Sequence, residues 1–284
     1  MFPPVDTKSA PATAHFVREK FSSLFPGVEP VLLGPIFRDV ERLFNGDHPD
    51  YNPIDIRYHD LEHTLQATVC LALLFEGGQK SQAALQLSAR HFELGMAGAL
   101  LHDAGYLTLR SDRQGTGAKY TYCHVLRSCA FAATYLPTLG LIETEIAGVL
   151  GAISCTGPTK EISRLYFREP IERFIGQALA TADYLGQMAA ADYPDELEIL
   201  YHEFEESDNF SHVPESKRVF KSARDLINRT PAFWTKIVRP KLEKDFGGAC
   251  HFLATPCPHG TNAYIEAVER NIALVESRIA AGGT

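Results

Sequence analysis

Two aspartates occupy positions where a free carboxylate is unfavourable. Asp103 and the preceding His102 follow the small, apolar segment GMAGALL, and Asp183 lies between the segments IGQALATA and YLGQMAAA. A charged side chain in such surroundings requires an ion partner or a bound cation. Carboxylate and imidazole groups are the ligands of divalent metals that activate water. These residues therefore predict a shared metal ion, although Asp183 after Thr-Ala would also suit the first position of a new helix.

A second stretch, YHDLEH, offers His59 and His63, four residues apart. Residues at this spacing share one face of a helix. Both imidazoles can then bind one metal, or one binds the metal while the other points at the substrate. A single histidine of this kind is more often structural or exposed, and the metal prediction depends on the joint pattern.

The amino-acid composition indicates which kinds of molecule we expect this protein to bind. The 284 residues carry a formal charge of -8, which disfavours nucleic-acid polymers and anionic membranes as main partners. It does not exclude a small phosphorylated substrate, because a bound metal dominates the field of its pocket. The first 16 residues contain three prolines and no apolar core. We therefore expect no signal peptide and a cytoplasmic location.

The elements that position these residues have helical periodicity, and alternating strand patterns are almost absent. We predict an all-α protein with a loose tail over residues 1–12 and one helical domain over residues 13–284, which includes a C-terminal helical extension. The segment 244–262, rich in Gly, Pro and Cys, is expected to be a loop. The main helices are expected at Val31–Phe44, Leu61–Leu74, Ser81–Leu101, Thr121–Tyr135, Ile142–Ala152, Ile171–Ala190, Leu197–Glu206, Glu215–Asn228 and Ala263–Ile279.

The order His, His-Asp, Asp resembles the signature of the HD-domain metal-dependent phosphohydrolase superfamily, from about Tyr58 to Gln187. The resemblance implies an HD-domain helical bundle. It also implies that the metal ligands are His63, His102, Asp103 and Asp183.

YHDLEHTLQAT is also similar to the YHNxxHA motif of class I cyclic nucleotide phosphodiesterases. That resemblance implies that His59 is the general acid and His63 a ligand. Those enzymes carry HDxxH, whereas this chain has Tyr106 at the last position, and Ser154 and Cys155 stand where a further histidine is expected. We therefore expect one tightly bound divalent ion (Mn, Mg, Fe, Ni or Zn). His124 then contacts the substrate or a weaker second ion.

The expected reaction is hydrolysis of a phosphomonoester or phosphodiester, with a nucleotide-like substrate implied by the resemblance. Asp103 would help to orient the attacking water, and His59 would protonate the leaving oxygen. Arg57, Lys119 and Arg127 are candidate cations for the phosphate. The sequence leaves open whether the chain forms a homodimer.

Three features near the C-terminus allow further interpretations. TNAYIEAVERN resembles the phosphodiesterase stretch that holds the base, with Thr261 in place of its Gln and Tyr264 in place of its Phe; a plain amphipathic helix is the alternative. CHFLATPCPH has a composition that suits zinc, but its spacings match no standard site, so an ordinary loop is favoured. The acidic run YHEFEESD is expected to be a solvated helix face.

Two rival functions use the same residues. A di-iron oxygenase would require two bridged irons and additional histidines, which the missing histidine near Ser154 disfavours. A nucleotide-binding signalling module with a degenerate site is the rival that is not an enzyme, and the intact set of candidate ligands argues against it.

Overall fold

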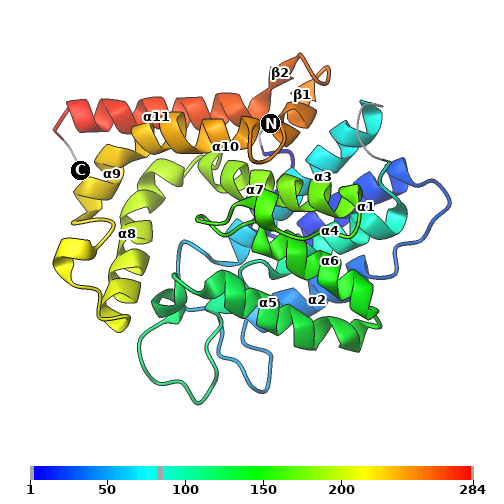
Figure 1. Ribbon diagram of the computed structural model, residues 1–284, viewed down its shortest axis with the longest axis horizontal. Helices are drawn as coiled ribbons and strands as arrows, with labels where there is room; N and C mark the ends of the chain where they lie inside the picture. The colour runs from blue at the N-terminus through cyan, green and yellow to red at the C-terminus, as the bar shows by residue number, and fades with distance from the viewer. Residues whose placement is uncertain (1–2, 82–85, 283–284) are drawn as a thin grey trace.

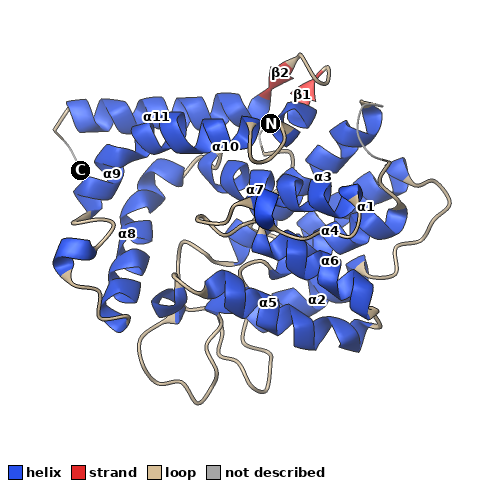
Figure 2. Ribbon diagram, in the orientation of Figure 1, coloured by secondary structure: helices blue, strands red, loops and turns tan. Residues whose placement is uncertain are grey.

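The computed structural model describes residues 3–81 and 86–282, and over these ranges the protein is a helical bundle (Figures 1 and 2). The all-α prediction is confirmed. The strands of the described chain are two short antiparallel segments, β1 (Ala254–Thr255) and β2 (Thr261–Asn262). The α-helices are α1 (Ala10–Leu24), α2 (Leu33–Phe44), α3 (Leu61–Lys80), α4 (Ala89–Leu101), α5 (His124–Tyr135), α6 (Glu143–Ser154), α7 (Pro170–Met188), α8 (Tyr193–Phe210), α9 (Ala223–Phe233), α10 (Arg239–Glu243) and α11 (Ala263–Ala280).

Helices α3 and α7 form the centre of the bundle and pack against each other extensively (Figure 1). Small residues make this possible, since Ala178, Ala182 and Gly186 recur at every fourth position of α7 and are buried. A Cβ atom on Gly186 would lie 2.9 Å from the backbone nitrogen of Ala67 in α3. The close approach brings side chains one turn earlier on each helix, His63 and Asp183, within contact distance.

The chain turns sharply after α4. This helix is held in the core by Met96, Leu100 and Leu101, which are fully buried. A short 3-10 helix, η1 (Ala104–Tyr106), follows directly after Asp103. A Cβ atom at position 105 would collide with the carbonyl oxygen of His124, so glycine is required there. The start of α5 is thereby held against the segment that carries Asp103.

The N-terminal half differs from the prediction in three places. The tail over residues 1–12 is not loose throughout: residues 1–2 lie outside the described range, but Thr7 is buried and α1 begins at Ala10. The helix expected to end at Leu74 continues to Lys80, because buried glycines are tolerated where the core packs around them. Of the helix expected from Ser81, residues 82–85 lie outside the described range, and α4 begins only at Ala89.

The C-terminal half differs as well. The helix expected over Glu215–Asn228 begins at Ala223, because the Ser222 hydroxyl accepts the Asp225 N–H and defines the first turn. Sequence patterns did not predict the π-helical turn over Trp234–Val238 or α10. In this half α11 packs against α7, α8 and α9.

In the part of the chain that the structure describes, no helix has both the length and the apolar character needed to cross a lipid bilayer. One domain over residues 13–284 stays a prediction.

Candidate metal centre

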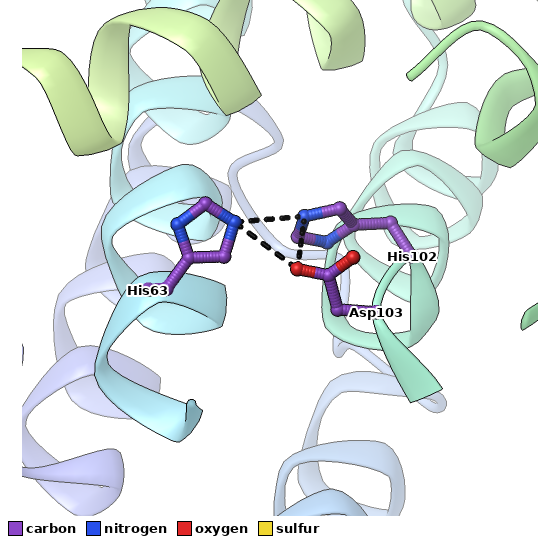
Figure 3. A group of neighbouring side chains, drawn as sticks. All are labelled: His63, His102 and Asp103. Carbon is purple, nitrogen blue, oxygen red and sulfur yellow. Dashed lines mark hydrogen bonds and ion pairs between the residues drawn. The ribbon is translucent and has the colours of Figure 1, made fainter. Parts of the chain in front are cut away.

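Three ligand atoms from two helices meet in the protein interior (Figure 3). His63 Nε2 lies 3.4 Å from His102 Nε2 and 3.1 Å from Asp103 Oδ2. His102 Nε2 lies 3.3 Å from the same carboxylate oxygen. Ligand atoms about 2.1 Å from one ion, on adjacent vertices of its coordination shell, are about 3.0–3.4 Å apart. The three atoms are therefore spaced for a common metal ion.

Asp183 joins this group from α7. Its Oδ1 lies 3.4 Å from His63 Nε2 and 3.6 Å from His102 Nε2. The structure thus brings together all four residues that the sequence predicts as ligands. Their roles as ligands stay a prediction.

The start of α3 is fixed next to this group. Asp60 precedes the first helical residue, and its Oδ1 accepts the backbone N–H of His63 at 3.0 Å. Such a cap satisfies one of the free N–H groups of the first turn. His63 is consequently held in a regular helical turn with its imidazole directed at the centre.

Burial makes the charges of this group strongly interdependent. His63, His102 and Asp103 are at most 4% exposed. Burial opposes a charged imidazole, but the carboxylates of Asp103 and Asp183 outweigh it and raise the pKa of His63 to about 10. Burial likewise opposes a charged Asp103, yet the neighbouring His102 and His63 lower the pKa of this carboxyl well below its usual range. Protons or a cation must therefore balance the two carboxylates, and a divalent ion would displace those protons.

The donor set fits a metal. His102 Nδ1 donates to the carbonyl oxygen of Ala99 at 2.7 Å, because a carbonyl can only accept. In a neutral imidazole the lone pair is then on Nε2, directed at the group. The buried Asp103 Oδ2 accepts no hydrogen bond of ordinary geometry from the described residues. A cation would satisfy both atoms.

Asp103 also faces His124. The Nε2 of His124 lies 3.7 Å from Asp103 Oδ1, while its Nδ1 donates to the Thr121 carbonyl oxygen at 2.7 Å. Burial lowers the pKa of His124, which favours the neutral ring with a lone pair on Nε2. The two oxygens of Asp103 thus face different imidazoles, an arrangement compatible with a bridging carboxylate.

His59 is oriented by a glutamate that the sequence analysis missed. Its Nδ1 lies 2.5 Å from Glu203 Oε2, and the other oxygen of Glu203 accepts the backbone N–H of Tyr58 at 2.8 Å. The acidic run that contains Glu203 was predicted to be solvated, and this is wrong for Glu203 and Asp208, which are 4% and 2% exposed. Glu203 and the buried Ser207 are four residues apart and share one face of α8, but neither is apolar, so the sequence pattern did not mark this face as buried.

Two further side chains support the group. The ring of Tyr106 is stacked on His59 and on His124, with ring centroids 4.7 Å and 4.6 Å apart. Gln187 Nε2 lies 3.3 Å from Asp183 Oδ1, and its Oε1 accepts the Tyr58 hydroxyl at 2.6 Å. These contacts could not be predicted from the sequence, since they depend on how α3, α7 and η1 pack.

The three cations that were predicted to bind a phosphate group lie in different environments. Lys119 is buried and pairs with Asp112 Oδ2 at 2.6 Å, so its charge is engaged away from the four candidate ligands. Arg127 donates to the carbonyl oxygens of Gly105 and Leu107, a structural role. Arg57 is exposed and lines a cavity together with His63.

Tyr264 is 5% exposed, and its hydroxyl interacts with Cys70. It also lines the larger of the two cavities described below, and its contact with a substrate base stays a prediction. A search against family models finds no match to this chain, and a search of curated proteins finds no relative.

Two neighbouring cavities lie near the group, and one of the candidate ligands, His63, lines the smaller of them. The smaller, of about 80 Å³, is lined by His63, Arg57 and four carboxylate side chains. The larger, of about 410 Å³, shares Glu62, Gln66, Ala190 and Asp192 with it. Residues near the N-terminus form part of its wall, and Thr7 donates a hydrogen bond to Glu62 at 3.3 Å.

Proposed function

We propose that this protein is a metal-dependent phosphohydrolase of the HD type. The observation that supports this is the buried meeting of His63, His102 and Asp103, with Asp183 in contact with both imidazoles. The ligand types, their order along the chain and the helical bundle all agree with the HD resemblance. The proposed reaction is hydrolysis of a phosphomonoester or phosphodiester bond in a nucleotide-like substrate.

A divalent ion held by these residues would act as a Lewis acid and would lower the pKa of water towards neutral. The protein contributes orientation and proton transfer. Asp103 Oδ1, turned away from the two Nε2 atoms of His63 and His102, is available to orient the attacking water. His59 holds a proton for the leaving oxygen, and Glu203 fixes its ring through Nδ1.

The charges that line the smaller cavity favour one class of phosphate ester over the other as the substrate. Its lining includes one guanidinium, Arg57, and four carboxylates. A phosphodiester carries one negative charge and a phosphomonoester up to two, so the acidic lining disfavours the monoester more. We therefore propose a phosphodiester as the preferred substrate. The four carboxylates belong to Asp60, Glu62, Asp192 and Glu196.

Elemental analysis of protein purified without added metal tests the proposal. Hydrolysis of bis(p-nitrophenyl) phosphate and p-nitrophenyl phosphate is then measured with Mn2+, Mg2+, Ni2+ or Fe2+. We expect bound metal and faster cleavage of the diester, both lost in His102→Ala. Inactivity towards both esters with every metal, alongside tight nucleotide binding, would instead support a signalling module.

The pairing of Asp103 Oδ1 with His124 supports a weaker second ion and keeps the di-iron oxygenase as the second candidate. Two irons per chain together with oxygen consumption would favour the oxygenase. One divalent ion and ester hydrolysis without oxygen uptake would favour the hydrolase.

A further inference from the structure

A second group of metal-binding side chains lies far along the chain from the first. It consists of Glu243, Cys250 and His251, whose ligand atoms all lie within 4.8 Å of one another. His251 Nε2 is 2.8 Å from Glu243 Oε2. In Figure 1 the segment between α10 and α11 lies at the edge of the molecule, where β1 and β2 project.

The backbone between α10 and η7 (Ala249–Leu253) closes this group. Gly247 and Gly248 adopt left-handed conformations with φ of 63° and 70°, and the Gly248 N–H donates to the Leu242 carbonyl oxygen at 3.0 Å. The chain therefore reverses directly after α10, and Cys250 and His251 come to lie beside Glu243.

The segment after η7 also contacts residues of this group. Asn262 Nδ2 donates to the Cys250 carbonyl oxygen at 2.9 Å. Cys257 Sγ lies 3.7 Å from the carbonyl oxygen of His251, so a second thiol is adjacent. The zinc set considered from sequence, Cys250, His251, Cys257 and His259, is thereby changed: Glu243 joins from α10, and neither Cys257 nor His259 is one of the three residues whose ligand atoms meet.

We propose that Glu243, Cys250 and His251 bind a zinc ion that joins α10 to the C-terminal segment. A thiolate with an imidazole and a carboxylate suits zinc, whereas magnesium and manganese prefer oxygen ligands. On binding, the Cys250 thiol releases its proton to solvent. The fourth position is open to Cys257 or water. This site is independent of the phosphohydrolase proposal.

Cobalt distinguishes the two groups because only this one contains a thiol. We expect metal-free protein titrated with Co2+ to develop a near-ultraviolet thiolate-to-cobalt charge-transfer band, and His102→Ala to retain it. Cys250→Ser should abolish the band and weaken zinc binding by about 100-fold, about 3 kcal/mol for one lost ligand. Cys123→Ser, at an exposed cysteine on another segment, is the matched control.

Glu243→Gln provides a test that does not touch the core, since Glu243 is exposed. We expect it to bind zinc more weakly than the wild type while its melting temperature without metal is unchanged. The proposal is overturned if wild-type protein shows no charge-transfer band, or if the band persists in Cys250→Ser. Equal zinc affinity of Glu243→Gln and wild type would remove Glu243 from the site.

Discussion

The two candidate metal groups are built in opposite ways. The first is buried and draws its side chains from α3, the end of α4 and α7, so its geometry depends on the packing of the whole core. The second combines the exposed Glu243 and His251 with the buried Cys250, and its members are brought together by one local turn between α10 and η7. Buried ligands on separate helices are pre-positioned for chemistry, whereas a local surface site is better suited to stabilising a loop.

The largest expected effect is on the rate of hydrolysis, and it distinguishes the two candidate metal groups. In His102→Ala we expect hydrolysis to fall by more than about 10³-fold, since a bound ion contributes several kcal/mol of transition-state stabilisation. Metal analysis and diester hydrolysis measure this. The reciprocal variant, Cys250→Ser, should keep full hydrolytic activity. A similar loss of activity in both variants would contradict the division into two independent groups.

Glu203→Gln tests the general acid without altering a candidate ligand. We expect kcat to fall by about 10²-fold at unchanged metal content, because His59 loses the carboxylate that orients it. Glu205→Gln, at a partly exposed position on the same helix, is the control and should behave like wild type. Loss of bound metal in Glu203→Gln would show that Glu203 supports the ligands instead.

Gln187→Leu probes the support of Asp183. Removal of the amide contact at 3.3 Å should weaken metal binding by about 10-fold to 100-fold, the usual effect of losing a hydrogen bond to a ligand. Competition with a chelator measures the affinity. An unchanged affinity would mean that Asp183 is oriented by the helix alone.

The smallest expected effect is on stability, and it comes from an ion pair that belongs to neither candidate metal group. Lys119 lowers the pKa of Asp112 to about 2, so the pair contributes stability above about pH 4, which is lost as the pH falls towards 2. We expect Asp112→Asn to lower the free energy of unfolding at pH 7 by about 1–2 kcal/mol, a value reduced for solvent screening. Urea unfolding should show this difference shrinking between pH 4 and pH 2, with or without chelator. A difference that stays constant with pH would reject the pair as its source.

The sequence predicted the all-α fold and the residues that meet in the first group, because buried aspartates in apolar segments have few alternatives. It did not predict Glu203 as the partner of His59, since an acidic run is normally solvated and only packing shows which face is buried. The sequence also did not show that Lys119 pairs with Asp112 or that Tyr264 interacts with Cys70, and the substrate contacts expected of both residues stay predictions. The segment over residues 244–262 was predicted to be a loop from its Gly, Pro and Cys content, but it contains η7, β1 and β2. Glu243 comes from α10, a helix that periodicity did not reveal.

The close contact of α3 and α7 has a consequence for dynamics. An ion held between His63 and Asp183 would link two helices that are distant along the chain, one turn before the close approach of their backbones at Ala67 and Gly186. Removing it should increase amide hydrogen exchange first in the early turns of α3 and the middle of α7, while α9 and α11 keep their protection.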